Sequence, residues 1–240
     1  MPIFLNFDDP TFVQRFEDIL NSDRNDNLDV NRVVIDILAD VKTRGDEAIL
    51  ELTHRFDKIE LDNEKLRFTK NEIEEISSTI SLDERKALDL AATRIRVYHE
   101  KQKPEDVSWV DEIGVELGWR WTPLDSVGIY VPGGLASYPS SVLMNSIPAQ
   151  VAGVKRVAMV VPTPTGKINP TVLYAAKVSG VDEIYRIGGA QAIAALAYGT
   201  QTIVPVDKIT GPGNSYVAAA KRQVFGKVGI DMIAGRLKFW

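Results

Sequence analysis

The sequence repeats a pattern of apolar strand, short turn and helix four times between Ser126 and Phe225. The expected strands lie at residues 127–131, 156–161, 183–187 and 208–210. Residues 156–161 are almost entirely apolar, which is typical of a strand buried on both faces. Alternating strands and helices predict parallel strands joined by right-handed crossovers. We therefore predict an α/β fold with a Rossmann-like parallel sheet.

Three glycine-containing turns follow strands of this pattern. They are Pro132-Gly-Gly134, Gly188-Gly-Ala-Gln191 and Gly211-Pro-Gly-Asn214. Because the carboxyl ends of parallel strands meet at one edge of a sheet, we expect these turns to line one crevice. Glycines let the backbone approach a ligand closely, and helix N-termini attract anions, so a phosphate or a dinucleotide would fit there. The G-x-G-x-x-G fingerprint is absent, and each turn alone is more often only a tight turn.

The N-terminal part of the chain is predicted to be almost wholly helical. The expected helices lie at residues 9–20, 29–44, 46–56, 69–77 and 81–103. Gly45 makes a tight junction between two of them, and capping-box patterns at Thr69 and Ser81 begin two others. The polar residues 21–27 are expected to form a turn, and residues 66–68 are expected to form a short strand.

Two features of the sequence leave alternatives open. Residues 108–121 predict a β-hairpin that carries three tryptophans, which either form a recognition surface or, as is commoner, cover a core. Pro148 interrupts the helix expected at residues 139–153, so that helix either kinks or restarts after Ser146.

These patterns predict how the chain is divided. We expect an N-terminal helical tail at residues 1–25 and a helical region with a β-hairpin at residues 26–125. A Rossmann-like domain follows at residues 126–235, and a divergent tail follows at residues 236–240. The mainly helical region therefore precedes the sheet that carries the expected crevice.

Charge and composition argue against several classes of protein. The net charge is −5 and the basic residues are scattered, so no nucleic-acid partner is expected. No apolar run reaches the length of a membrane span, and the N-terminus lacks the features of a signal peptide, so we expect a cytoplasmic protein without a membrane partner. Cysteine is absent, and His54 and His99 lie in helical stretches where a ligand role is uncommon.

Several sequence blocks resemble the N-terminal half of histidinol dehydrogenases, from roughly residue 30 to residue 235. The blocks are Val41–Ala48, Val127–Gly134, Tyr138–Asn145, Gly188–Gly199, Val206–Asn214 and Ile230–Gly235. The resemblance implies an NAD-dependent, zinc-containing oxidation of L-histidinol, a small amino alcohol, through the aldehyde to L-histidine. Tyr130, Gln191 and Asn214 match the NAD-contacting positions of the family. It also implies a homodimer of intertwined subunits.

The chain departs from the family pattern after Gly235. The family continues with proline, serine and glutamate, whereas this chain reads Arg236-Leu-Lys-Phe-Trp240. The zinc ligands and the catalytic glutamate and histidine of the family lie beyond this point, so we assign no catalytic residue and no metal ligand. We expect a histidinol dehydrogenase truncated after about residue 235 and inactive alone. The alternatives are a related dehydrogenase of another small alcohol, a non-catalytic nucleotide-binding or subunit-pairing module, and a nonfunctional product.

Overall fold

The structure is a computed structural model that describes residues 4–133 and 138–232, with the backbone alone for residues 18–28. Its main sheet has five parallel strands in the order β5-β4-β3-β6-β7. The strands are β3 (Ser126–Tyr130), β4 (Arg156–Val160), β5 (Glu183–Tyr185), β6 (Lys208–Thr210) and β7 (Gly229–Ile230). The predicted fold class, an α/β fold with a Rossmann-like parallel sheet, is confirmed. The short strand β7 was not expected from the sequence.

The strand order places a topological switch point between β3 and β6. The chain runs from β3 to β4 and β5 on one side, and then returns to pair β6 with the other side of β3. Val127 is aligned with Val157 of β4 and with Lys208 of β6. In open parallel sheets, ligands bind outside the carboxyl ends of the strands at such a point.

Helices cover both faces of the sheet. Side chains alternate along a strand, so Tyr130 and Ile129 belong to two different apolar cores. The core with Tyr130 is covered by α1 (Phe12–Arg44), α2 (Asp46–Asp57), α7 (Gly189–Tyr198) and α8 (Ser215–Val224). The core with Ile129 is covered by α3 (Lys70–Ser78), α4 (Leu82–Glu100), α5 (Pro139–Ala152) and α6 (Pro170–Val178). A short 3-10 helix, η1 (Pro164–Gly166), follows β4.

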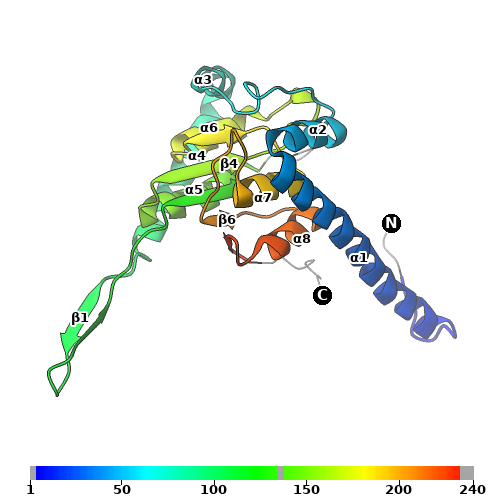
Figure 1. Ribbon diagram of the computed structural model, residues 1–240, viewed down its shortest axis with the longest axis horizontal. Helices are drawn as coiled ribbons and strands as arrows, with labels where there is room; N and C mark the ends of the chain where they lie inside the picture. Colours follow the sequence, from blue (N-terminus) through cyan, green and yellow to red (C-terminus); the bar gives the residue numbers. More distant parts are fainter. Residues whose placement is uncertain (1–3, 134–137, 233–240) are drawn as a thin grey trace.

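The prediction of a turn at residues 21–27 is wrong, because these residues lie inside α1, one continuous helix of 33 residues. Those residues are polar but include neither proline nor glycine, so they lower helix propensity without breaking the helix. The C-terminal part of α1 packs on the sheet side through residues such as Val34 and Val41, and its N-terminal part extends away from the body (Figure 1). The stretch predicted as a separate helical tail is therefore continuous with the helix that follows it.

The predicted helix ends are largely confirmed. Thr69 and Ser81 cap α3 and α4, and each forms a capping box with the glutamate three residues later. Gly45, with φ of 60°, separates α1 from α2. Pro148 lies inside a single helix, α5, so no second helix begins after Ser146. The strand expected at residues 66–68 is only an isolated bridge between Arg67 and Tyr185.

The predicted hairpin is present, but it does not cover a core. Strands β1 (Val107–Val110) and β2 (Glu116–Trp119) form an antiparallel pair that projects from the body (Figure 1). Trp109, Trp119 and Trp121 are 44%, 52% and 60% exposed, so the expectation that they cover a core is wrong. The rings of Trp109 and Trp119 meet edge to face, with centroids 5.6 Å apart.

Candidate ligand-binding cleft

A cleft of about 800 Å³ lies at the carboxyl ends of the central strands. Its lining comes from α1, the C-terminal end of α2, the segments after β3 and β4, and the first turns of α7 and α8. Tyr130, Gln191 and Asn214 all line it, so the structure brings together the three residues singled out in the sequence. The first turns of α7 and α8 add backbone N–H groups, which favour an anionic ligand group.

Tyr130 ends β3 and is only 3% exposed. Its hydroxyl oxygen accepts a hydrogen bond of 3.1 Å from the backbone N–H of Gly189. Burial raises the pKa of Tyr130 to about 12, and the negative charge of Asp57 adds to this effect. The phenol therefore stays protonated at neutral pH. Within the described residues its proton has no acceptor, so the hydroxyl is available as a donor to a ligand.

Gln191 lies in the first turn of α7 and is 1% exposed. Among the residues that the structure describes, its side-chain oxygen Oε1 has no hydrogen-bond partner. A buried acceptor without a donor costs on the order of 1–3 kcal/mol, which a ligand donor would recover. Gly189 has φ of 63°, and a Cβ atom there would lie 2.6 Å from Gln191 Oε1. Glycine at position 189 therefore leaves room for the amide.

Asn214 is the N-cap residue of α8. Its side-chain oxygen accepts a hydrogen bond of 3.1 Å from the backbone N–H of Val217. The oxygen therefore stabilises the helix end, and the side-chain NH₂ group remains as a hydrogen-bond donor for a ligand.

The glycines of the turns let neighbouring turns pack closely against each other. A Cβ atom on Gly133 would lie 2.5 Å from the carbonyl oxygen of Pro162, and one on Gly188 would lie 2.4 Å from the Pro162 side chain. At Gly211, which has φ of 110°, it would lie 2.1 Å from the carbonyl oxygen of Tyr130. These glycines let neighbouring strand ends approach each other, and Gly133 also lines the cleft.

An ion pair that sequence reasoning missed, formed by a buried ammonium group and a partly exposed carboxylate, holds the turn after β6. The ammonium group of Lys221 on α8, 4% exposed, donates to the carbonyl oxygen of Gly211 at 3.0 Å and to the carboxylate of Asp231. Asp231 in turn accepts from the backbone N–H of Gly211 at 2.9 Å. Asp231 belongs to a block that resembles the family, and this was the only signal for it in the sequence.

Asp57 lines the cleft and was also missed by sequence reasoning. It is the last residue of α2, and burial raises the pKa of its carboxyl group. Its Oδ2 atom is buried and has no partner among the described residues. Nothing in the local sequence marks it, because its proximity to Tyr130 depends on how α2 packs on the sheet.

The two histidines lie outside the cleft lining. His54 on α2 is exposed and lies 3.8 Å from the carboxylate of Glu60, and His99 on α4 packs against the ring of Tyr98. In residues 4–133 and 138–232, no three histidine, cysteine, aspartate or glutamate side chains are grouped as metal ligands. The described residues therefore do not fit the zinc site that the resemblance implies. No helix in the same part of the chain is long and apolar enough to cross a membrane.

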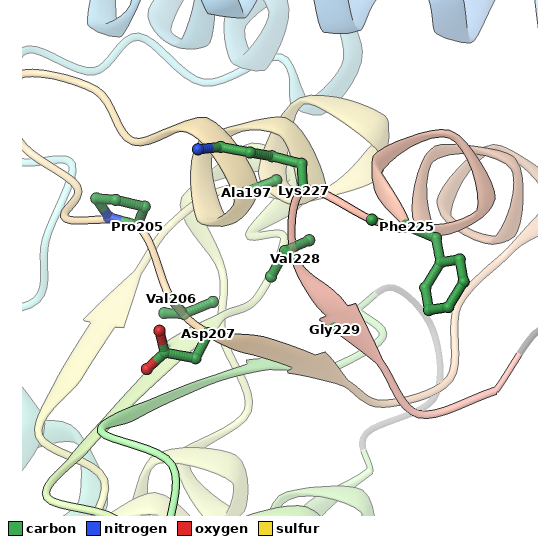
Figure 2. Close-up of a pocket in the computed structure, with 9 residues that line it drawn as sticks. Ala197, Pro205, Val206, Asp207, Phe225, Lys227, Val228 and Gly229 are labelled. Atoms are coloured by element: carbon green, nitrogen blue, oxygen red, sulfur yellow. The ribbon is translucent and has the colours of Figure 1, made fainter.

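A smaller hollow of about 380 Å³ lies near the amino ends of β6 and β7, and Figure 2 shows Pro205, Asp207 and Lys227 around it. The carboxylate of Asp207 accepts 2.8 Å hydrogen bonds from both the N–H and the hydroxyl of Ser126. These bonds tie the starts of β3 and β6 together. Ligands of open parallel sheets bind at the opposite, carboxyl edge, so the larger cleft is the candidate site.

The parallel sheet with a cleft at its switch point defines a Rossmann-like α/β protein. Residues 20–237 match the family model described as histidinol dehydrogenase. Over 235 residues the chain is 62% identical to a histidinol dehydrogenase of Ruegeria pomeroyi and 60% identical to one of Rhodospirillum rubrum. In both cases the match covers 98% of this chain and 54% of the relative.

A solved structure gives the same result. The crystal structure of histidinol dehydrogenase from Elizabethkingia anophelis matches with a TM-score of 0.82 and 39% identity, over 85% of this chain and 47% of that one. The chain belongs to the histidinol dehydrogenase family, which is a family of oxidoreductases. It spans about half the length of the curated relatives that it matches.

Proposed function

We propose that this chain forms the NAD-binding half of a histidinol dehydrogenase. The whole enzyme would oxidise L-histidinol through histidinal to L-histidine in histidine biosynthesis, with NAD as the oxidant and zinc as the metal. One observation carries the proposal: the three residues that match the NAD positions of the family come from three separate strand ends and line one cleft. A cytoplasmic location is proposed from the biosynthetic role.

The polar groups of the cleft suit a dinucleotide. The first turns of α7 and α8 offer backbone N–H groups, which favour the pyrophosphate. Tyr130 and Asn214 offer hydrogen-bond donors, whereas Gln191 offers an acceptor that has no partner among the described residues. NAD supplies the hydride acceptor when bound. The residues of this chain would bind it and orient it.

We propose that the part of the full-length enzyme that this chain does not match supplies the groups that carry out the reaction. The resemblance locates the zinc ligands and the catalytic glutamate and histidine in sequence that follows the blocks matched here. Tyr130 stays protonated below its pKa of about 12, so it is unsuited to abstract a proton from an alcohol at neutral pH. The described residues of this chain are therefore proposed to bind NAD, and Tyr130 is not proposed as the base for histidinol oxidation.

We also propose that the chain pairs with a second copy, as the family resemblance implies. The hairpin and the start of α1 both project from the body (Figure 1). The hairpin exposes Trp109, Trp119 and Trp121, and the N-terminal segment exposes Phe4, Phe7 and Phe16. Exposed apolar surface of this kind is typical of an interaction site.

Calorimetric titration tests the proposal. The unaltered chain is expected to bind NAD, and Gln191→Ala and Asn214→Ala are each expected to weaken binding by about tenfold. Binding of NAD that both variants leave unchanged would contradict the assigned cleft. Absence of NAD binding by the unaltered chain would favour a nonfunctional product.

A further inference from the structure

Two oxygen atoms that line the cleft lack donors within the described residues. They are Oε1 of Gln191 and Oδ2 of Asp57, and both are buried. An ionised carboxylate only accepts hydrogen bonds. A ligand that satisfies this cleft must therefore bring hydrogen-bond donors to both positions. A nucleotide carries such donors as ribose hydroxyls and amide groups.

Asp57 occupies an unfavourable place for a carboxylate. It ends α2, where the helix dipole is negative, and Lys58 follows in a left-handed conformation with φ of 55°. Burial raises the pKa of its carboxyl group. Among the described residues, Asp57 has no ion-pair partner. The nearby Arg55 guanidinium lies over the ring of Phe56, 5.3 Å from its centroid. A partly buried carboxylate kept without a partner at a cleft is a candidate for ligand binding.

Within the described residues, the segment after β4 offers no carboxylate for a ribose. In dinucleotide-binding folds, an acidic residue that contacts the adenosine ribose 2′-hydroxyl favours NAD over a cofactor with a 2′-phosphate. That residue usually follows the second strand, which here is β4, and the segment after β4 reads Val161-Pro-Thr-Pro164. Asp57 reaches the same cleft from α2, where Pro162 and Pro164 also form part of the lining.

We propose that the Asp57 carboxylate accepts hydrogen bonds from the adenosine ribose hydroxyls of NAD, and that it excludes cofactors with a 2′-phosphate. The inference rests on the proposed function. A phosphate at the ribose 2′ position would place a dianion beside this carboxylate and remove the hydroxyl donor. Both effects weaken binding of NADP.

The test compares NAD with NADP by calorimetry on the 240-residue chain and its variants. The unaltered chain is expected to bind NAD at least about tenfold more tightly than NADP. Asp57→Asn keeps the shape and removes the charge, so the preference for NAD is expected to fall by about tenfold. Glu64→Gln makes the same change of charge outside the cleft lining and should leave the preference unchanged.

Each outcome decides the inference. If the unaltered chain binds NAD and Asp57→Asn keeps the original preference, the role of Asp57 is overturned while the proposed function stands. If the unaltered chain binds neither nucleotide, both are overturned. Circular dichroism of the variant checks folding, and a stable Asp57→Asn chain is expected because the substitution removes a charge from the end of a helix.

Discussion

The hydroxyl of Tyr130 accepts a hydrogen bond from the backbone N–H of Gly189 at 3.1 Å. This bond joins the end of β3 to the start of α7, two segments that are 59 residues apart in the chain. It uses the hydroxyl oxygen as an acceptor and leaves the hydroxyl proton for a ligand. Tyr130 therefore both holds the cleft together and faces it.

Tyr130→Phe is expected to lower the free energy of unfolding by about 1–2 kcal/mol, because the N–H of Gly189 loses its partner in a buried site. Urea denaturation followed by circular dichroism measures the change. Tyr98→Phe, which alters an exposed tyrosine on α4, serves as the control and should leave the stability unchanged. Equal stability of the two variants would contradict the role of the Tyr130 hydroxyl.

Stability is expected to fall as the pH rises above 10. Burial raises the pKa of both Tyr130 and Tyr185 to about 12 in the folded chain, against 10.0 for an unperturbed tyrosine. The folded state therefore holds these protons more tightly than the unfolded state, and the stabilisation is complete below pH 10 and is lost between pH 10 and pH 12. Unfolding curves measured across this range should be less pH-dependent in Tyr130→Phe than in the unaltered chain.

Gln191→Leu is expected to keep or raise the stability while it weakens NAD binding by about tenfold, because the amide oxygen that it removes has no partner in the described residues. Gln201→Leu is the matched control. The oxygen of Gln201 accepts from the N–H of Asp46 at 2.8 Å, so its loss should cost about 1 kcal/mol of stability and leave NAD binding unchanged. Thermal melts and NAD titrations of both variants distinguish the two roles. A large loss of stability in Gln191→Leu would contradict the hypothesis that the Gln191 amide oxygen is kept to bind a ligand.

Asp231→Ala is expected to destabilise the chain by about 2 kcal/mol, since the buried ammonium group of Lys221 loses its carboxylate partner and keeps only the carbonyl oxygen of Gly211. The double variant Lys221→Met, Asp231→Ala should recover part of this loss because no charge then stays buried. Chemical denaturation of the single and double variants measures the coupling. Additive effects of the two substitutions would show that the pair does not act together.

Limited proteolysis tests whether the regions before and after residue 125 fold as separate units. Their division at residue 125 stays a prediction. The hairpin tip near Ile113, which is 86% exposed, should be cut first. Val34 of α1 and Ile193 of α7 share one core, and Ala92 of α4 shares another with Val142 of α5. We therefore expect residues 30–104 and 126–230 to resist digestion together. Loss of residues 1–125 with survival of residues 126–230 would instead support separate units.

Local sequence patterns predicted most of the helices and strands, and the alternation of strands and helices predicted a parallel sheet. Glycine turns and apolar runs located β3, β4, β5 and β6, and the capping patterns located α3 and α4. The same local reasoning failed at residues 21–27, because polar residues that lack a helix breaker continue a helix once its other end is packed. It also failed for the hairpin tryptophans, because burial depends on what lies opposite a side chain.

The cleft was predictable only in part. Tyr130, Gln191 and Asn214 follow strands of one parallel sheet, so their meeting in space follows from the topology. Asp57 reaches the cleft from a helix outside the βα repeat, and Lys221 of α8 reaches the carbonyl oxygen of Gly211 in the turn after β6. No local pattern marks either contact, because both depend on how helices pack on the finished sheet.

A crystal structure of this chain with NAD tests the central claim most directly. The claim predicts that the nucleotide lies at the carboxyl ends of β3 and β6, within hydrogen-bond distance of Tyr130, Gln191 and Asn214. It also predicts that a donor group of the nucleotide faces Oε1 of Gln191. Nucleotide density at the hollow beside Lys227, or its absence from the cleft at saturating NAD, would contradict the account.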